Sequence, residues 1–577
     1  MERIIECVPN FSEGRDRNVI DRIAGAIASA KVISEGKEMK VKVLDVDPGE
    51  ATNRTVITFV GSPEAVVEAA FQGVRCAGAL IDMSRHHGAH PRSGACDVLP
   101  LVPVSGVTLE ECALMARKLA ERISTELGIP CYCYEAAAFK PERKNLAVCR
   151  AGEYEALPEK MADPERRPDF GPAEYNETVK KSGAVNVGAR NFLIAVNYNL
   201  NTTSTRRAMA VAFDVREKGR KAREGGSLTG KLIKDENGEQ VWIPGTLKGC
   251  KAIGWYIDEY GIAQVSMNIT DIDAVPLHVA YEEVCRAAAA RGLKVTGVEI
   301  VGLVPKRVLL DAGKFYLGKQ QRSKGISEEE ILKIAVKSMS LDDLKPFNPK
   351  EKVIEYLMVD EAEAAARERL VRMSVKGFAK ETASESPAPG GGSVSACMGA
   401  FGAALATMVA NLSAHKRGWD DRWEEFSDVA EKGQAVLDEL IFLIDEDTAA
   451  FNRIMDALSM PKGTAEEKAA LAAALEEATL YAASVPLRTM EASLKALPLA
   501  LEMARKGNPA SASDAGVAAL AAVAGIRGAA LNVRINASGL SDKTPAEPLL
   551  RRAEEIIEEA VALQDEVLEE VNRNIGS

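Results

Sequence analysis

The chain has 577 residues, of which 46% are hydrophobic and 27% are charged, a composition typical of a folded protein rather than a disordered one. At about 150 residues per domain, the length predicts roughly four structural units. Acidic side chains (84) outnumber basic ones (72), which gives a formal net charge of −12. Binding of DNA or RNA by counterion displacement needs a basic surface, so we expect no nucleic-acid partner.

The N-terminal sequence MERIIECVPNFSEG carries charges where a signal peptide needs an apolar run, so we expect a cytoplasmic protein. The longest nearly uncharged apolar run, residues 398–412, has 15 residues. A membrane span needs ~20, so this run predicts a buried helix and no membrane association. Of ten scattered cysteines only Cys131 and Cys133 are close together, which indicates reduced thiols rather than a disulfide framework.

Strand-like and helix-like segments alternate in the first part of the chain, and the same order occurs twice. In the first copy, strands are expected at 4–9, 41–47, 54–61, 95–104 and 129–136. One helix follows the first strand, a second begins at Pro63, and a third begins at the capping box of Thr108 and Glu111. In the second copy, strands are expected at 191–200, 251–258, 262–270 and 294–305, with helices at 204–217 and after Pro276.

This repeated order is the split βαβ pattern of ferredoxin-like sheets. We therefore expect two α/β subdomains, 1–185 and 186–345, that face each other across a ligand-binding cleft. Residues 219–248 interrupt the second copy, and Asn237-Gly238 inside them predicts a hairpin turn.

Beyond a charged linker at 346–367, the Ala-rich residues 368–577 predict an all-α bundle. Small side chains permit close helix packing. Because aromatic residues are few here, neighbouring helices or another subunit must complete burial, and we expect a homo-oligomer. The fold class is thus α/β plus all-α.

The segment RHHGAHPRSGACD, residues 85–97, holds three of the five histidines. His86 and His90 are four residues apart, a spacing that would suit a metal ion on a helix. Gly88 and Pro91 interrupt such a helix, which favours a histidine base beside arginines that face an anionic substrate. Histidines that only form hydrogen bonds within the loop are the alternative.

Two further groups could carry chemistry. Asp45 and Asp47 come at the end of a predicted strand, where Asp47 could orient an imidazole; an Asx-type turn is the alternative. Gly390, Gly391 and Gly392 precede an Ala-rich helix and would expose backbone N–H groups to an anion. A flexible joint that permits tight helix packing is equally consistent with these glycines.

Asp447 is expected on the buried face of a long helix. The apolar positions that define this face are Leu437, Leu440, Ile441, Ile444, Thr448 and Phe451. Burial raises the pKa of a carboxyl, and a carboxylic acid protonated near neutral pH can act as a general acid. An ion pair with a distant Arg or Lys is the alternative.

Seven motifs, in order along the chain, together resemble one family. Four resemble the formiminotransferase domain: IIECVPNFSEG at 4–14, LDVDPGEATNRT at 44–55, SRHHGAHPRSGACDVLPLVPV at 84–104 and RAGEYEALPEK at 150–160. Three resemble the cyclodeaminase domain: SPAPGGGSVSA at 386–396, IDEDTAAFNRIMDALSMPK at 444–462 and NPASASDAGVAAL at 508–520. The chain therefore resembles the formiminotransferase-cyclodeaminase family.

The resemblance implies two reactions of histidine degradation and one-carbon metabolism. The first domain would move a formimino group from N-formimino-L-glutamate to N5 of tetrahydrofolate, which is polyglutamylated in the expected case. The second would release ammonia and form 5,10-methenyltetrahydrofolate. The resemblance also implies a ring-shaped homo-oligomer, with an octamer expected, and no metal ion.

Residue roles follow by position. The resemblance implies His90 as the transferase base, Asp47 as its support and Asp447 as the cyclodeaminase acid. It implies folate contacts within 171–183, bounded by Gly171, Pro172 and Gly183, and at Glu299, where the family usually has Gln. Arg92 is expected to bind a substrate carboxylate by a bidentate pair.

Three alternatives stay open on the sequence alone. The donor could be formiminoglycine, because a glycine pocket is not legible in the sequence. The helical domain could be a methenyltetrahydrofolate cyclohydrolase, since the same helical family includes such enzymes. The chain could be a folate-binding scaffold, although His90, Asp47 and Asp447 are all present, which argues against degenerate sites.

Overall fold

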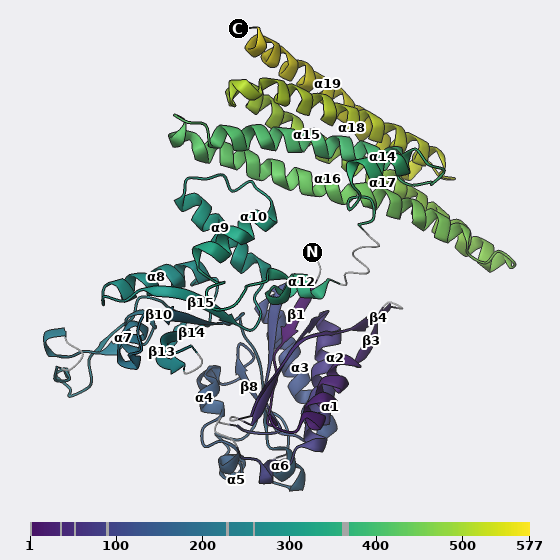
Figure 1. Cartoon of the computed structure of the whole chain (residues 1–577). Helices are drawn as coiled ribbons and strands as arrows, with labels where there is room; N and C mark the ends of the chain where they lie inside the picture. Colours follow the sequence, from purple (N-terminus) through teal and green to yellow (C-terminus); the bar gives the residue numbers. More distant parts are fainter. Residues whose placement is uncertain are drawn as a thin grey trace. The chain divides into compact units, whose positions relative to one another are not determined.

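The computed structural model describes residues 3–34, 37–50, 53–87, 92–172, 174–226, 230–257, 260–359 and 368–576. The chain forms two compact units, each described here by itself (Figure 1). The α/β unit comprises Met1–Leu309 and Met339–Met358, and the helical unit comprises Leu310–Ser338 and Val359–Ser577.

The first subdomain of the α/β unit is a seven-stranded mixed sheet. Its strands are β1 Ile4–Cys7, β2 Asn10–Phe11, β5 Lys42–Gly49, β6 Arg54–Gly61, β7 Cys96–Ser105, β8 Cys131–Glu135 and β9 Val185–Ala189. The order is β1-β6-β2-β7-β9-β8, with β5 paired to β6. The core lies between one sheet face and three helices, α1 Arg17–Ala28, α2 Pro63–Leu80 and α3 Leu109–Leu127.

Strand β9 differs from the expected pattern. It pairs in parallel with both β7 and β8, so the first sheet runs on to Ala189, past the bound expected at residue 185. The capping box of α3 is confirmed: the Thr108 side chain accepts from the Glu111 N–H, and the Glu111 carboxylate accepts from the Thr108 N–H. A separate hairpin joins β3 Lys31–Ser34 and β4 Lys37–Lys40.

The second subdomain is a four-stranded antiparallel sheet with the order β13-β14-β10-β15. Its strands are β10 Ile194–Leu200, β13 Cys250–Ile257, β14 Ile262–Ile269 and β15 Val295–Val301, and its helices are α7 Thr205–Val215 and α8 Leu277–Ala289. The helices cover one face, where the Tyr198 ring of β10 lies 6.5 Å from the Tyr281 ring of α8. The expected strand–helix–strand–strand–helix–strand order is confirmed.

The insertion at 219–248 forms a small ribbon from β11 Arg220–Lys221 and β12 Trp242–Ile243. The expected turn is present: Asp235 accepts from the N–H groups of Asn237 and Glu239, and Gly238 has a φ of +82°. A glycine tolerates this left-handed conformation without steric cost.

The helical unit contains five long helices stacked side by side (Figure 1). They are α15 Gly391–Ala414, α16 Trp423–Leu458, α17 Ala465–Lys506, α18 Ala512–Ser538 and α19 Glu547–Ile575. The close packing expected from small residues is confirmed, because a Cβ on Gly402 would lie 2.8 Å from the Ala518 carbonyl oxygen. The all-α part of the expected fold class is therefore confirmed.

Residues 310–338 differ from the expected domain assignment. Most of α9 Lys306–Lys319 and all of α10 Glu328–Ser338 pack with the helical unit rather than with the second α/β subdomain. Lys314 Nζ lies 3.0 Å from Glu431 Oε2, and Asn411 Nδ2 donates to the Gly325 carbonyl oxygen at 2.8 Å.

Two helical segments are long and apolar enough to cross a membrane by length and composition, Gly391–Ala414 and Pro509–Ser538. Other helices bury 61% and 56% of their most apolar windows. The helix expected around 398–412 is confirmed and extends well beyond the apolar run, but it is buried only in part, since Phe401 is 54% exposed. All ten cysteines are free, as expected.

Candidate active sites

Acidic side chains gather on one face of the first sheet. Asp45 and Asp47 on β5 are in register with alternate residues of β6. Glu6 on β1 is in register with Val60, which belongs to the same alternate set. Cross-strand partners share a face, and the intervening Phe59 points into the core on the other side. The three carboxyl groups therefore lie on the face that α1, α2 and α3 leave uncovered.

Asp47 is exposed near the end of β5, where the sequence places it. Among the described residues no hydrogen bond reaches its carboxylate, so the Asx-turn alternative has no support. Partial burial raises the pKa of Asp45, and the charge of Asp47 raises it further. Burial also raises the pKa of Glu6 to about 7, with Arg190 acting in the opposite direction. The sequence analysis did not single out Glu6.

His90 lies outside the described residues, but both ends of its loop are placed. Asn53 Nδ2 donates to the His87 carbonyl oxygen at 3.0 Å, and His86 Nε2 lies 3.0 Å from the Asn53 carbonyl oxygen. Asn53 Oδ1 also accepts from the Gly14 N–H at 3.0 Å. Asn53 comes six residues after Asp47 and adopts a φ of +48°, which Asn tolerates better than most residues. It thereby connects the Asp47 strand to the histidine loop.

Arg92 lies at the other end of that loop, among the chain's own carboxylates. Its Nη1 and Nη2 donate to Glu155 at 2.8 and 2.6 Å, and Nη1 also donates to Glu153 at 3.0 Å. Nη2 further donates to the His86 carbonyl oxygen at 3.2 Å. These contacts, led by the Glu155 bonds, raise the pKa of Arg92. The guanidinium is thus engaged by two of the chain's own carboxylates.

The second sheet presents a polar face opposite α7 and α8. Asn197 Nδ2 donates to Glu299 Oε2 at 3.0 Å. One row along, Gln264 Nε2 donates to Asn199 Oδ1 at 2.7 Å, and Trp255 Nε1 donates to Gln264 Oε1 at 3.1 Å. Glu299 therefore pairs with one amide on a face that carries further side-chain amides, and such a face can bind a heterocycle with several donors and acceptors.

The two glycines that bound the expected folate segment have backbone reasons to be glycine. Gly171 has a φ of +118°, and a Cβ there would lie 2.7 Å from Pro130 Cα. Gly183 has a φ of +67°, and a Cβ there would lie 2.3 Å from the Ser93 carbonyl oxygen. Gly183 forms an antiparallel bridge with Gly94, so this end of the segment lies two residues from Arg92. Pro172 follows Gly171 directly and is partly buried.

In the helical unit, Asp447 on α16 meets the three glycines at the start of α15. Its Oδ2 accepts from the Ser393 N–H at 2.9 Å and from Ser393 Oγ at 3.1 Å. A Cβ on Gly392 would lie 2.0 Å from Asp447 Oδ1, so only glycine permits this approach. A Cβ on Gly391 would lie 3.4 Å from Asn532 Nδ2, which brings a third helix, α18, to the same point. Gly390 is the N-cap residue of α15.

Burial raises the pKa of Asp447, and the two Ser393 hydrogen bonds oppose the shift. Among the described residues no Arg or Lys pairs with Asp447, and its Oδ1 accepts no hydrogen bond, so the ion-pair alternative has no support. The neighbouring Asp445 is committed to the backbone: it accepts from the N–H groups of Leu370 and Val371 at 2.8 and 3.1 Å.

The apolar face proposed for α16 is partly wrong. Ile441 and Phe451 are each 39% exposed in this chain, whereas Leu440 and Ile444 are buried as expected. The buried row runs instead through Val436, Leu440, Leu443, Ile444 and Ala450. Asp447 lies at the margin of this row, three residues from Ile444 and Ala450.

Family models match three successive segments of this chain. The formiminotransferase domain, N-terminal subdomain, matches residues 4–190; the formiminotransferase domain matches 195–359; formiminotransferase-cyclodeaminase matches 374–555. The formimidoyltransferase-cyclodeaminase of Mus musculus is 42% identical over 560 residues, which cover 97% of this chain and 97% of the mouse protein. The chain belongs to the formiminotransferase-cyclodeaminase family.

Shorter relatives match each part of this formiminotransferase-cyclodeaminase chain separately. The glutamate formimidoyltransferase of Streptococcus pyogenes serotype M1 is 39% identical and covers 55% of this chain and 94% of its own length. The methenyltetrahydrofolate cyclohydrolase of Methylorubrum extorquens is 41% identical over 203 residues, which are 35% of this chain and 98% of that enzyme. The resemblance stated from the sequence motifs is confirmed.

Two side chains lie at the candidate sites although the sequence analysis did not single them out. Asn53 belongs to the LDVDPGEATNRT motif. The sequence signal for its role is an Asn in a turn that follows a strand carrying two aspartates. Asn532 stands in the middle of a helix, where an amide has no capping role to mark it; its signal appears only when α18 is packed against the glycines. Among the described residues no group of three or more metal-binding side chains is present.

Proposed function

We propose that the α/β unit transfers the formimino group from N-formimino-L-glutamate to N5 of tetrahydrofolate. We further propose that the helical unit converts the resulting 5-formiminotetrahydrofolate to 5,10-methenyltetrahydrofolate and ammonia. One observation carries the proposal most strongly: Asp447, free of any cationic partner among the described residues, is held by Ser393 against three glycines. Residue type, burial and family position all lead to that carboxyl.

In the transfer step, N5 attacks the formimino carbon and must lose a proton as the bond forms. His90 is the proposed base, and Asp47 would stabilise the imidazolium that results. The same proton then goes from His90 to the amine of glutamate as the carbon–nitrogen bond breaks. Asn53 and Arg92 support this assignment by fixing the two ends of the histidine loop, and Arg92 takes a positioning role in place of the expected substrate contact.

In the cyclisation step, N10 attacks the carbon of the protonated formimino group, C=NH2+. The attack leaves a neutral amino group, which must depart as ammonia to give the methenyl cation. A protonated Asp447 can supply the proton from Oδ1, because Ser393 holds only Oδ2. The carboxylate recovers its proton from N10, which loses one as the ring closes. The raised pKa of Asp447 supports this role, because a general acid must be protonated near its working pH.

Tetrahydrofolate, polyglutamylated in the expected case, is a co-substrate in this proposal, and neither step uses a metal ion. The proposed contacts in the α/β unit are Glu299 and the segment bounded by Gly171, Pro172 and Gly183. In the helical unit, the N–H groups beside Gly390, Gly391 and Gly392 are proposed to bind substrate. Glu299 is supported by its place on a polar face whose amides already exchange hydrogen bonds.

The proposed protein is a cytoplasmic enzyme of histidine degradation that binds neither nucleic acid nor membranes. We also propose a homo-oligomer, with an octamer expected. Large apolar side chains on two helices support it: in this chain Phe401 and Leu412 of α15 are 54% and 47% exposed, and Leu531 and Ile535 of α18 are 64% and 66% exposed. A second subunit would remove this apolar surface from water.

Cyclohydrolase activity of the helical unit is the second candidate, favoured by the cyclohydrolase relative of that unit. One experiment separates the possibilities: formiminoglutamate and formiminoglycine are each offered with tetrahydrofolate, and methenyl absorbance and ammonia are recorded together. The proposal predicts equal amounts of both products with formiminoglutamate. Hydrolysis of supplied methenyltetrahydrofolate without ammonia release from the formimino compound would favour the cyclohydrolase. No turnover with either donor would favour the scaffold.

A further inference from the structure

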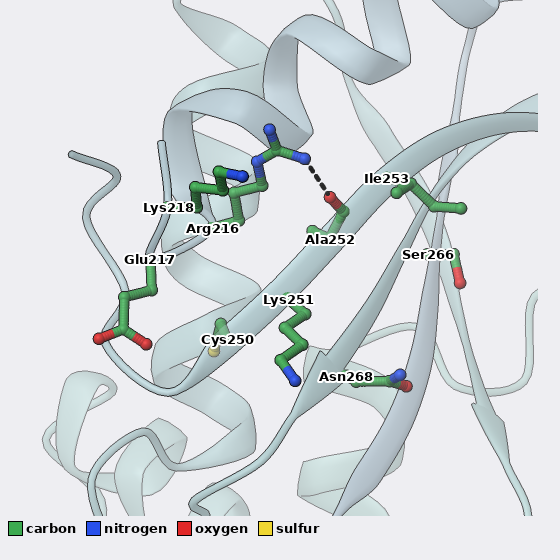
Figure 2. A pocket seen from close by; sticks show the side chains of 9 residues that line it. All are labelled: Arg216, Glu217, Lys218, Cys250, Lys251, Ala252, Ile253, Ser266 and Asn268. Atoms are coloured by element: carbon green, nitrogen blue, oxygen red, sulfur yellow. Dashed lines mark hydrogen bonds between the residues drawn. The ribbon is translucent and has the colours of Figure 1, made fainter. Parts of the chain in front are cut away.

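A cavity of about 530 Å³ opens at the β13 edge of the second sheet (Figure 2). We call it the cationic pocket, and it is lined by Arg216, Glu217, Lys218, Cys250, Lys251, Ala252, Ile253, Ser266 and Asn268. Ala252 and Gly254 share one face of β13, and Gly254 packs on α7. Lys251 and Ile253 alternate with them and so lie on the opposite face. The pocket floor is therefore the same sheet face that carries Asn197 and Glu299.

The charges around the cationic pocket are unbalanced. Three cations line it, and the one carboxylate, Glu217, accepts from the Gly249 N–H at 3.0 Å. Arg216 donates only to carbonyl oxygens, of Gly219 at 3.0 Å and Ala252 at 3.3 Å, and its pKa is lowered by burial. Among the described residues no carboxylate lies within ion-pair distance of Arg216. A half-buried guanidinium without a counter-charge favours an anionic ligand.

Among the described residues no carboxylate lies within ion-pair distance of either lysine of the pocket. Lys218 Nζ lies 4.9 Å from the ring centroid of Trp242, a residue of the inserted ribbon, and no described carboxylate pairs with it. Lys251 faces Asn268 across the strand pair. Gly254 packs on α7 and Lys251 is three residues earlier on the same strand, so Lys251 lies on the opposite face of the sheet, away from α7.

We propose that the cationic pocket binds a glutamyl carboxylate of a substrate in the transferase site, which makes Lys251 and Lys218 specificity-determining residues. This inference rests on the proposed function. Formiminoglutamate carries two carboxylates and formiminoglycine one, so a site with three cations that no described carboxylate pairs with fits the dicarboxylic donor. Arg92, the residue that the sequence suggested for this contact, is occupied by Glu153 and Glu155. The glutamyl tail of folate carries the same kind of carboxylate and is the second ligand that could occupy the pocket.

The test is the double variant Lys218→Met/Lys251→Met, which removes both charges but leaves Arg216 to hold the backbone at the β13 edge. Lys221→Met is the matched control, because Lys221 also lies beside Trp242 but does not line the pocket. Initial rates of transfer are measured with formiminoglutamate or formiminoglycine as donor. Each is measured with tetrahydrofolate or with tetrahydropteroate, which lacks the glutamyl group.

The double variant is expected to raise the KM for formiminoglutamate roughly tenfold or more, since each lost bond is charge-assisted. The KM for formiminoglycine and the kcat should change less than about twofold, as should every constant of Lys221→Met. A rise in the KM for tetrahydrofolate, but not for tetrahydropteroate, would support the same chemistry with the folate tail as occupant. Unchanged KM values for both glutamyl substrates would overturn the proposal.

Failure of the proposed function looks different. In that case the unaltered enzyme would use neither donor with either acceptor. Titration calorimetry with glutamate then tests the cationic pocket independently of activity. Binding by the unaltered chain, with an affinity at least tenfold lower in the double variant, would support the proposed binding. Equal binding, or no binding by either protein, would overturn it.

Discussion

The two candidate sites are built from different kinds of structure. In the helical unit, Asp447, Ser393 and Asn532 lie on α16, α15 and α18, whose packing leaves no room for a side chain at Gly392. In the α/β unit, the candidate groups come from a strand end, a turn and a loop, connected through Asn53 and Arg92. The first site is fixed by close helix packing, and the second by a few polar contacts. The two should therefore respond differently to mutation.

The largest expected effect is on the loop site. His90→Ala should lower formimino transfer by ~10²–10⁴, the usual contribution of a positioned base. Cyclisation of supplied 5-formiminotetrahydrofolate should continue at the rate of the unaltered enzyme, because Asp447 belongs to the other unit. Both activities are followed separately, by glutamate release and by methenyl absorbance. A fall in transfer of less than roughly tenfold would reduce His90 to a binding or structural residue.

The next effect tests the packed site. In Gly392→Ala the added Cβ would lie 2.0 Å from Asp447 Oδ1 and must displace the carboxyl. Misplacing a catalytic group by about 1 Å costs ~10²-fold, so cyclisation should fall by that order while transfer is unchanged. Gly391→Ala is the matched control, since its Cβ meets Asn532 at an ordinary 3.4 Å. Equal losses in the two variants would mean that helix packing, not Asp447, is being disturbed.

A smaller effect is expected where the loop is connected to the strand. Asn53→Asp keeps the acceptor for the Gly14 N–H and tolerates the positive φ, but it removes the donor to the His87 carbonyl oxygen. Transfer kcat should fall roughly tenfold with cyclisation unchanged, because one neutral hydrogen bond is worth about 1 kcal/mol and the carboxylate also repels the carbonyl. Asn145→Asp, at the N-cap of α4 Leu146–Cys149, should have no effect, since Asp caps equally well.

The smallest effect concerns pH. A general acid works while protonated, so cyclisation kcat should fall as pH rises through the pKa of Asp447. The hydrogen bond from Ser393 Oγ stabilises the carboxylate of Asp447. Ser393→Ala should therefore raise that pKa and move the falling limb of the plot of cyclisation kcat against pH to higher pH. Ser459→Ala, at the exposed end of α16, is the control. A limb that moves to lower pH, or stays in place, would contradict the general-acid role.

Much of the fold could be predicted because it depends on local periodicity. The strands of both copies, the capping box at Thr108 and the turn at Asn237-Gly238 follow from residue pattern and turn chemistry. Strand β9 could not be predicted in the same way, because five residues, VNVGA, close before another strand carry no signal for parallel pairing with β7 and β8. The assignment of residues 310–338 depends on contacts with Glu431 and Asn411, more than seventy residues away.

The sites show the same division. Asp447 could be predicted from helix spacing even though Ile441 and Phe451 proved exposed, because the neighbouring Ile444 sets the same face. Arg92 could not be assigned from spacing, since its partners Glu153 and Glu155 stand some sixty residues later and compete with any substrate for the guanidinium. Asn53 and the cationic pocket likewise emerge only when distant strands and turns are placed together.

The most direct test of two separate sites is Asp447→Asn, supplied with formiminoglutamate and tetrahydrofolate. Asn has nearly the same shape and can still accept from Ser393, but it cannot donate a carboxylic proton. The account predicts an unchanged fold and oligomer, release of glutamate at the unaltered rate, accumulation of 5-formiminotetrahydrofolate and almost no ammonia. Ammonia release near the unaltered rate would contradict the role of Asp447. Loss of transfer together with cyclisation, in a folded variant, would contradict the separation of the two sites.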